Sequence, residues 1–212
     1  MDDDVVHVRA VRSVGVETVA LTFEAPTGFD AAPGQFIQVS ARIDDDLVQR
    51  YFTISSPGVD ETFEITVDVD PEGTLAPWLA GLDPGDTVRM DGPFGSAYYE
   101  GEPRAVVLGA GPGIGPAIGI GERAIELGNQ VAIVVPPDTD THEDRLQELS
   151  TDGAFVTEAR EGLEAATAQA LDQVDGTLFV YGFAPFVSDA VEAIAAAGRD
   201  PDEAKIESFG PG

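Results

Sequence analysis

A glycine-rich segment in the second half of the chain has the composition of a phosphate-binding loop. It reads Gly109-Ala110-Gly111-Pro112-Gly113-Ile114-Gly115-Pro116 and follows an apolar run at 105–108. Glycines let a ligand approach the backbone, and the N-terminus of a following helix offers free N–H groups and a partial positive charge. The third glycine of a dinucleotide fingerprint is replaced by Pro116, which suits a first helical turn. The segment predicts a site for a phosphate-bearing ligand, with a ligand-free strand–helix turn as the alternative.

The elements around this loop alternate between strand and helix. We expect strands at 105–108, 130–135, 154–157, 177–181 and 205–209, and helices at 116–127, 143–150, 163–173 and 186–197. Such alternation indicates a parallel sheet covered by helices on both faces. The glycine-rich loop then follows the first strand of the sheet, where α/β sheets place phosphate-bearing ligands.

The first hundred residues have a different pattern. Short runs rich in Val, Ile, Thr and Phe predict strands at 5–14, 18–24, 35–40, 51–55, 62–69 and 87–90, with one helix at 74–82. Proline, glycine and aspartate separate them as turn residues. Six strands at this spacing predict a closed or nearly closed antiparallel barrel. The pattern changes near residues 99–103, so we expect two domains, at 1–100 and 103–212.

The charge of the chain is strongly negative. It has 39 acidic and 11 basic residues and a formal net charge of -28, and Lys205 is its single lysine. This surface repels itself in dilute buffer, whereas molar salt shortens the screening length to about 3 Å. We therefore expect a halophilic, cytoplasmic protein, with an ordinary acidic protein as the alternative. The same charge argues against nucleic acid and anionic membranes as partners.

The chain contains no cysteine. This excludes disulfides, thiolate zinc sites and cysteine-ligated iron–sulfur clusters within these residues. His7 and His142 are far apart in sequence, so we expect no metal site. No apolar run is long enough to span a bilayer, and the acidic start differs from a signal peptide, so we expect neither.

Six motifs follow one another in a fixed order. They are Arg50-Tyr51-Phe52-Thr53-Ile54-Ser55, Gly73-Thr74-Leu75-Ala76, Gly92-Pro93-Phe94-Gly95, the glycine-rich loop, Tyr181-Gly182-Phe183-Ala184-Pro185 and Glu207-Ser208-Phe209-Gly210. This set, on a barrel followed by an α/β domain, resembles the ferredoxin–NADP reductase superfamily over nearly the whole chain. The resemblance implies a six-stranded antiparallel Greek-key barrel that binds FAD, and a parallel-sheet domain that binds NAD(P)H.

The resemblance assigns the flavin to the first motif, residues 50–55. Arg50 would neutralise the diphosphate, for which a guanidinium fork is well suited; a surface ion pair is the alternative. Phe52 replaces the family tyrosine and loses one hydroxyl hydrogen bond, about 1 kcal/mol. Thr53 would hydrogen-bond the reactive edge of the flavin ring, with simple β-propensity as the alternative.

The second motif would receive the flavin phosphate at a helix N-terminus. Gly73, Thr74, Leu75 and Ala76 align with the family turn, in which Ala76 replaces a serine or threonine. Thr74 is a candidate helix cap in its place. A plain helix start is the alternative.

The second domain would bind the pyridine nucleotide. The resemblance places its pyrophosphate or nicotinamide end at Gly111, Gly113, Ile114 and Pro116. Tyr181 replaces a family cysteine next to the expected contacts at Gly182, Phe183 and Pro185. Glu207 and Phe209 align with an acidic–aromatic pair at the flavin face, where Phe209 would shield the ring until nicotinamide displaces it; packing at the sheet end is the alternative.

Charge near the expected ribose site favours NADH. Asp138 and Asp140 follow the second strand of the α/β domain, and the sequence has no arginine until Arg145. A carboxylate accepts a hydrogen bond from a free 2′-hydroxyl and repels a 2′-phosphate.

Together these features predict a flavin-dependent oxidoreductase that takes hydride from NAD(P)H onto FAD. The electron acceptor could be a ferredoxin, a flavodoxin, free flavin or a small oxidant. Two alternatives stay open. One is a non-catalytic or electron-transfer subunit of a larger redox complex, and the other is a degenerate nucleotide-binding module, suggested by Phe52, Ala76 and Tyr181.

Overall fold

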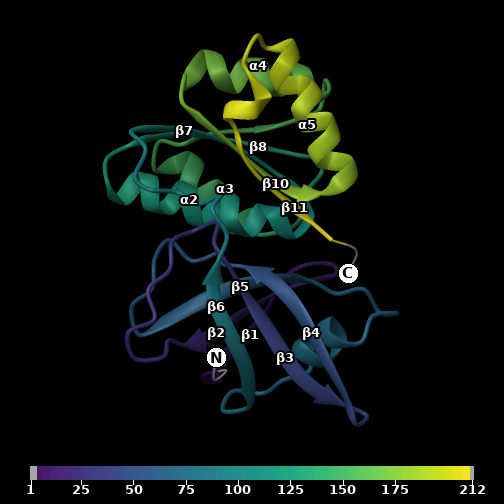
Figure 1. The fold of residues 1–212 in the computed structure, drawn as a ribbon. Coiled ribbons are helices and arrows are strands. Elements are labelled where there is room, and N and C mark those ends of the chain that lie inside the picture. Colours follow the sequence, from purple (N-terminus) through teal and green to yellow (C-terminus); the bar gives the residue numbers. More distant parts are fainter. Residues whose placement is uncertain (1–3, 211–212) are drawn as a thin grey trace.

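The computed structural model describes residues 4–210, which form two halves stacked end to end (Figure 1). The N-terminal half is an antiparallel barrel, and the C-terminal half is a parallel sheet between two layers of helices. We call them the barrel half and the α/β half. No helix within residues 4–210 is long and apolar enough to cross a membrane.

The barrel half contains six strands. They are β1 (Asp4–Gly15), β2 (Thr18–Glu24), β3 (Phe36–Ile43), β4 (Asp46–Thr53), β5 (Thr62–Asp68) and β6 (Thr87–Phe94). The order is β4-β3-β6-β1-β2-β5, and every neighbouring pair is antiparallel. A bridge between Ile54 and Ile65 joins the two outer strands, which confirms the predicted Greek-key barrel.

Side chains alternate between the interior and the surface along the strands, and the inward-pointing ones form the barrel core. Ile37 and Val39 of β3 are fully buried, as are Leu21 and Phe23 of β2. The short helix α1 (Leu75–Ala80) packs onto this core with Leu75 and Leu79. Trp78, the single tryptophan of the chain, packs partly buried against the same cluster.

The hairpin of β3 and β4 extends beyond the predicted strands at 35–40 and 51–55. Its strands run to Ile43 and from Asp46, and the turn between them places Asp44 at φ 49° and Asp45 at φ 71°. Aspartate tolerates this left-handed region, so two aspartates can form a turn that usually contains glycine or asparagine. The helix predicted at 74–82 is also shorter and ends at Ala80.

The α/β half contains five parallel strands and four α-helices. The strands are β7 (Arg104–Gly109), β8 (Gln130–Val135), β9 (Phe155–Glu158), β10 (Thr177–Phe183) and β11 (Lys205–Phe209), in the order β11-β10-β7-β8-β9. The helices are α2 (Ile114–Glu126), α3 (Glu143–Thr151), α4 (Leu163–Gln173) and α5 (Ala184–Ala196), with short 3₁₀ turns at Gly111–Gly113 and Pro201–Glu203. Helices α2 and α3 cover the sheet face toward the barrel, and α4 and α5 cover the other (Figure 1). This confirms the predicted parallel sheet.

Two glycines let α2 lie directly on the barrel. A Cβ atom at Gly119 would come within 2.9 Å of the Ser55 carbonyl oxygen, and one at Gly115 within 2.5 Å of the Thr66 hydroxyl oxygen. Real side chains do not approach so closely, so this contact requires glycine at both positions. The helix that follows the glycine-rich loop therefore also holds the two halves together.

Candidate functional site

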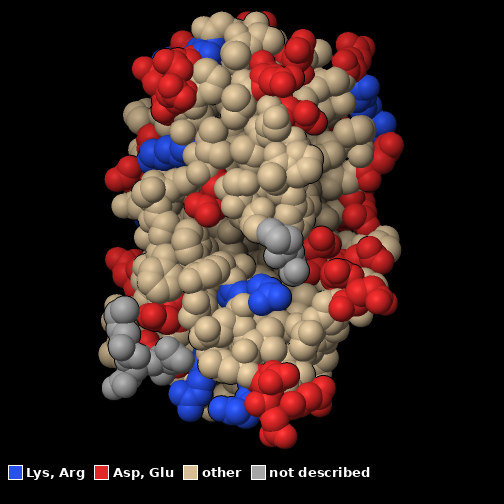
Figure 2. All heavy atoms as spheres, turned by 45° about the vertical axis from the view of Figure 1, so that its right-hand side comes forward, with Lys and Arg blue, Asp and Glu red and all other residues tan. Residues whose placement is uncertain are grey.

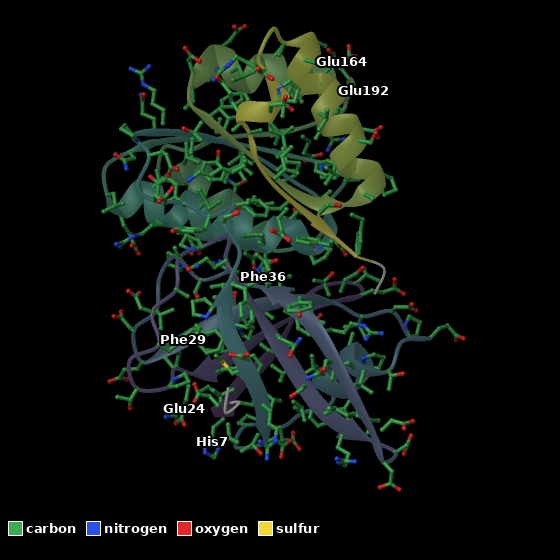
Figure 3. The ribbon with its side chains drawn as sticks, in the orientation of Figure 1. His7, Glu24, Phe29, Phe36, Glu164 and Glu192 are labelled. Carbon is green, nitrogen blue, oxygen red and sulfur yellow. The ribbon has the colours of Figure 1, made fainter. Side chains whose placement is uncertain are left out.

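A cavity of about 720 Å³ lies between the two halves. The barrel half lines it with Phe36, residues 50–53, Thr66, Asp68, Asp70, residues 72–76 and Phe94, and the α/β half lines it with Pro112, Phe183 and residues 207–210. Phe36 lies at the end of the barrel that faces the α/β half (Figure 3). The cavity therefore brings together residues separated by more than 150 positions in the sequence.

Eleven of the predicted site residues line this cavity. They are Arg50, Tyr51, Phe52, Thr53, Gly73, Thr74, Leu75, Ala76, Phe183, Glu207 and Phe209. Two residues of the first motif do not: Ile54 is fully buried in the barrel core, and the buried Ser55 hydroxyl donates a hydrogen bond to Glu64 (3.1 Å). The first motif therefore faces the cavity with its first four residues, because the chain turns inward at the bridge to β5.

Arg50 is the basic residue of the cavity wall. Its exposed guanidinium donates to the backbone carbonyl of Gln49 (2.8 Å) and forms no ion pair with any residue of 4–210. Four carboxylates line the same cavity, at Asp68, Asp70, Glu72 and Glu207. An arginine without a carboxylate partner in so acidic a chain leaves its donors available for an anionic ligand.

Three aromatic rings form one end of the cavity. Phe36 and Tyr51 pack edge to face with centroids 5.5 Å apart, and Phe94 lies 5.9 Å from Phe36 and 6.4 Å from Tyr51. Phe36 and Phe94 were not among the predicted site residues. Their signal in the sequence was their position beside turn residues, after Pro33-Gly34-Gln35 and within Gly92-Pro93-Phe94-Gly95.

The start of α1 differs from the prediction at Thr74. Thr74 occupies the N-cap position, but its side chain makes no capping hydrogen bond, so the predicted cap is wrong. Just before the helix, the backbone N–H of Gly73 donates to the Asp70 carbonyl (2.9 Å) and closes a turn. Thr74 has helical dihedrals, φ -105° and ψ -52°, whereas a capping hydroxyl usually needs an extended N-cap residue.

The glycine-rich loop packs tightly against β10. The N–H of Ala110 donates to the Tyr181 carbonyl (3.1 Å), and a Cβ atom at Gly113 would overlap that carbonyl. Ile114 and Pro116 are buried, and Ile114 belongs to the core between sheet and helices. Packing thus explains the glycine at 113, and Pro112 is the loop residue that reaches the cavity.

The ends of β10 and β11 supply an aromatic pair and a carboxyl group. Phe183 and Phe209 pack edge to face, with centroids 6.0 Å apart and ring planes at 88°. Burial raises the pKa of Glu207 above its usual range. Gly182, within β10, and Pro185, in the first turn of α5, do not line the cavity.

Tyr181 faces away from this cavity. It is fully buried, and its hydroxyl donates to the Ala97 carbonyl in the connection between the halves (2.5 Å). Burial, followed by the charge of Glu207, raises its pKa well above the usual value. The residue at the expected cysteine position therefore fixes the connection between the halves.

The predicted ribose-binding aspartates have separate environments. Asp138 is exposed in the turn after β8, where it pairs with Arg160 (3.1 Å), and Arg160 also pairs with Glu158 (2.6 Å). Asp140 instead accepts a hydrogen bond from the Val16 N–H of the barrel (2.7 Å). The expectation that no arginine lies nearby is wrong, because β9 carries the chain past Asp138 and the loop after it supplies Arg160.

A partly buried polar network joins the halves on another side of the junction. Arg145 of α3 donates to Glu64 of β5 (2.8 Å), to both oxygens of Glu122 on α2 (2.8 and 2.7 Å) and to the Ser55 carbonyl (3.1 Å). Arg12 of β1 binds the other oxygen of Glu64 (2.7 Å). These partners lie 23 to 90 positions from Arg145, so no local sequence pattern indicates this network.

His142 forms a second polar contact across the junction, at the cavity wall. Its Nε2 atom lies 2.8 Å from the hydroxyl of Thr66, a cavity-lining residue, and its backbone N–H donates to the Val14 carbonyl (2.7 Å). Burial, followed by the charge of Arg145, lowers the pKa of His142 to about 4. The imidazole is therefore neutral near pH 7, where it bonds the Thr66 hydroxyl across the junction.

Comparison with known proteins identifies the barrel half. Residues 6–99 match the family model for the oxidoreductase FAD-binding domain. A crystallised FAD/NAD-binding domain of nitric oxide dioxygenase from Vibrio cholerae has the same fold, with a TM-score of 0.81 and 19% identity over 100% of both chains. A ferredoxin NADP⁺ reductase from Neisseria gonorrhoeae gives a TM-score of 0.79 with 17% identity, over 98% of this chain and 99% of that one. The barrel half thus matches the FAD-binding domain family, and the whole chain has the two-domain fold of ferredoxin–NADP reductase-like proteins.

The first curated relatives that the chain matches are longer than the chain itself. The glycine betaine monooxygenase reductase subunit of Chromohalobacter salexigens is 26% identical over 96% of this chain and 64% of its own length. The chain spans 61–64% of the first curated relatives that it matches. The shared part of these relatives is thus the barrel half together with the α/β half.

Proposed function

We propose that this chain is a flavin-dependent reductase that moves electrons from NAD(P)H through FAD to a separate acceptor. The observation that carries this proposal is the cavity, where the β4 strand with Arg50 and Thr53 faces the β11 end with Glu207 and Phe209. Residues 1–100 would form the flavin-binding domain and residues 103–212 the nucleotide-binding domain. FAD supplies the redox chemistry, because its ring accepts a hydride and releases electrons.

The cavity fits FAD in its shape and its donors. It is concave and rich in aromatic and aliphatic side chains, as cofactor sites generally are. Arg50 would bind the diphosphate, Phe52 would pack on the flavin ring, and the Thr53 hydroxyl would hydrogen-bond its reactive edge. The turn at 73–76 would receive a phosphate through backbone N–H groups, although Asp70 and Glu72 border it. Thus Arg50 is the group that offsets this local negative charge.

The α/β half would present the nicotinamide to the same cavity. The loop with Gly111 and Gly113 would receive the pyrophosphate through its backbone, and Pro112 would border the nicotinamide. Phe183 and Phe209 would exclude water from the ring face. Hydride transfer requires close parallel rings more than a protein acid–base pair, so positioning is the main task of these residues. Glu207, whose pKa is raised, would hold a proton beside the ring to a higher pH than an exposed glutamate.

Nucleotide preference would depend on Asp138 and Arg160. The Asp138 carboxylate would accept a hydrogen bond from the ribose 2′-hydroxyl of NADH and repel a 2′-phosphate. Arg160 would orient that carboxylate through their ion pair. We therefore propose that the protein uses NADH at least as well as NADPH.

One observation favours a role as one component of a larger electron-transfer system. The first curated relatives are named as reductase subunits. The acceptor would then be a partner protein, with ferredoxin or flavodoxin among the candidates. The alternative of a degenerate, flavin-free module is less well supported, because it would leave Arg50 with no anion to bind.

The visible spectrum of the protein tests the proposal directly. Protein purified in 2 M KCl should show flavin absorption bands, heat should release FAD rather than FMN, and NADH should bleach the bands without oxygen. A colourless protein that takes up neither added FAD nor added FMN would refute the flavin-dependent activity. A coloured protein that NADH and NADPH both fail to bleach would indicate a flavin-binding module without reductase activity.

The acidic surface leads to a prediction on salt. Figure 2 shows separate clusters of carboxylates along the sides, the top and the lower end of the face drawn, and the formal charge is -28. We propose a halophilic, cytoplasmic protein whose thermal midpoint rises as KCl is raised from about 0.1 M, where the screening length is about 10 Å, to molar levels. Differential scanning fluorimetry over a KCl series measures this, with equimolar NaCl as a control for ion identity. Equal midpoints at both ends of the series would contradict a halophilic surface.

A further inference from the structure

The last strand of the sheet carries two residues of the cavity but has a neighbour on one side only. In the order β11-β10-β7-β8-β9, β11 pairs with β10 alone. Figure 1 shows β11 descending through the α/β half toward the junction with the barrel. Glu207 and Phe209 lie toward the end of this strand and line the cavity. A strand with one neighbour has only one ladder of backbone hydrogen bonds, so a further contact is needed to keep these two side chains in place.

Such a contact lies at the first residue of β11, Lys205. Its ammonium donates to the Tyr98 carbonyl (2.9 Å), to Glu100 (2.7 Å) and to Glu102 (2.6 Å), three residues of the connection between the halves. An ammonium group has three N–H donors, so this arrangement uses all of them. Lys205 is the single lysine of the chain, and 23% of its side chain is exposed. The start of β11 is therefore tied to the connection by a partly buried group rather than by a fully solvated ion pair.

The connection to which Lys205 is bonded is itself fixed. The Tyr99 N–H donates to the Pro33 carbonyl of the barrel half (3.1 Å), and the buried Tyr99 hydroxyl donates to the Glu102 carbonyl (2.8 Å). From the α/β half, the Asn129 amide donates to the same hydroxyl (2.9 Å). Lys205 is thus bonded to a segment that has its own contacts with both halves.

Cross-strand pairs extend this anchor to the cavity. In the parallel pair of β10 and β11, the opposite residues are Phe179 and Lys205, Tyr181 and Glu207, and Phe183 and Phe209. Lys205, Glu207 and Phe209 follow one another at two-residue intervals, so their side chains point to one face of the sheet. The Lys205 Nζ atom lies 5.3 Å from the centre of the Phe179 ring, and the Phe209 ring packs on Phe183 (6.0 Å). One row of side chains therefore runs from the connection to the cavity wall.

We propose that Lys205 is a positioning residue of the cavity, which holds Glu207 and Phe209 at the wall by tying β11 to the connection between the halves. The proposal rests on the reductase activity proposed above. Hydride transfer depends on the relative placement of two rings, and a displacement of about 1 Å can cost about 10²-fold in rate. FAD would be held mainly by the barrel half, through Arg50 and the turn at 73–76. Loss of the anchor should therefore slow hydride transfer while leaving the affinity for FAD nearly unchanged.

The test compares three variants with the parent protein in 2 M KCl. Lys205→Met keeps a side chain of similar length over the Phe179 ring but has no donor, and Lys205→Arg keeps the charge and the donors. The matched control is Arg199→Met. Arg199 is also in the α/β half, its side chain is 32% exposed, and it donates to Asp175 (2.6 Å) and to the Gly176 carbonyl (3.2 Å), away from the cavity. The two Met variants lose the same charge, so only the place of the loss differs.

Hydrogen–deuterium exchange tests the anchor without requiring flavin or activity. We expect Lys205→Met to speed exchange in the peptide that contains residues 205–209 at least about tenfold, because a strand paired on one side opens more often once its first residue is released. Lys205→Arg and Arg199→Met should exchange within about twofold of the parent in that peptide. Exchange in Lys205→Met that equals exchange in the parent would overturn the anchor.

Anaerobic stopped-flow reduction by NADH tests the consequence for the cavity. Lys205→Met should lower the limiting rate of flavin bleaching at least about tenfold, with the FAD dissociation constant within about twofold of the parent, and Lys205→Arg should restore the rate. Because burial raises the pKa of Glu207, a released strand end should move the titration of this group to lower pH. An equal loss of rate in Lys205→Met and Arg199→Met would overturn the positioning role. A parent protein that binds FAD but is not bleached would instead contradict the proposed reductase activity, while the exchange result would still decide the anchor.

Discussion

On one side of the junction between the halves, Arg145 is bonded to Glu64, Glu122 and a backbone carbonyl, whereas Arg50 faces the cavity without a carboxylate partner among residues 4–210. On the first side donors and acceptors satisfy one another, and Gly119 lets α2 touch the barrel backbone. On the second side the barrel half and the α/β half are separated by the cavity of about 720 Å³. The two sides therefore have different roles. The packed side holds the two halves in a fixed relative position, and the open side leaves its polar groups available to bind a ligand.

One loop takes part in both regions. Residues 136–142 include the exposed Asp138 and then Asp140, which is bonded to the barrel, and they end at the buried His142. Nucleotide contacts at the start of this loop would thus be anchored by the packed side at its end. Substitutions on the packed side should accordingly change the stability of the protein, and substitutions on the open side should change its affinity for ligands.

The largest effect should follow loss of the arginine on the packed side. Arg145→Met leaves Glu64 and Glu122 partly buried without their main partner, which typically costs about 3–5 kcal/mol of unfolding free energy. Urea denaturation in 2 M KCl measures the loss. Arg160→Met is the matched control, because its pairs are exposed and such pairs contribute about 0–1 kcal/mol. Equal losses in the two variants would show that the network is no stronger than a surface pair.

The packed side should also be sensitive to acid through His142. Because its pKa is about 4 when folded and 6.5 as the reference value, the unfolded chain binds more protons between these values. The contribution of His142 to the free energy of unfolding is therefore fully present above pH 6.5. It is lost as the pH falls toward 4, by on the order of 3 kcal/mol. His142→Gln should flatten that part of the pH profile, whereas His7→Gln, at an exposed edge of the barrel, should follow the parent. Parallel profiles for parent and His142→Gln would contradict the buried neutral imidazole.

On the open side, Arg50→Ala should weaken FAD without unfolding the protein. A hydrogen bond to a charged group contributes about 1.5–3 kcal/mol, which would appear in the FAD dissociation constant. Titration of apoprotein with FAD, followed by flavin fluorescence, measures it, and Arg104→Ala serves as a control for net charge. If Arg50→Ala retains FAD as tightly as the parent, the diphosphate does not lie at this guanidinium.

The smallest effect should come from the exposed end of the loop. Asp138→Ser removes a repelling carboxylate and leaves Arg160 with Glu158 as its one ion-pair partner in residues 4–210, so relative use of NADPH over NADH should rise about tenfold, or about 1.4 kcal/mol. Stopped-flow bleaching of flavin with each nucleotide measures the ratio. Arg160→Ser should not produce this rise, since it removes the group that would bind a 2′-phosphate. A parent that NADPH reduces tenfold faster than NADH would contradict this interpretation of the loop.

Local patterns were enough to predict most of the fold. Alternating apolar residues and turn chemistry located the strands of the barrel, and the strand–helix alternation located the parallel sheet. The predicted strand boundaries were wrong where the turn residues were unusual. Asp44 and Asp45 adopt the left-handed conformation that glycine usually occupies, so the residue types did not indicate a turn there. The strand carrying Arg50 and Thr53 was assigned to the flavin through the family resemblance of its motif, and the structure shows both residues in the cavity wall.

The parts of the site that were missed depend on distant partners. Arg160 reaches Asp138 from 22 positions away, and Arg145 meets Ser55 from 90 positions away. Thr74 was expected to cap α1 from residue type alone, but a cap depends on backbone dihedrals that the sequence does not reveal. Tyr181 was judged by the residue it replaces, whereas its orientation follows from the close approach of Gly34 and Ala97.

The position of Trp78 gives the molecule an internal optical probe. The tryptophan lies in α1, two residues beyond Ala76 of the cavity wall, and no other indole competes with its emission. Indole emission overlaps the near-ultraviolet absorption of oxidised flavin, so a ring bound in the cavity would quench it by energy transfer over this short path. Occupancy of the cavity can thus be followed by fluorescence in the unmodified chain, at any salt concentration and without an acceptor.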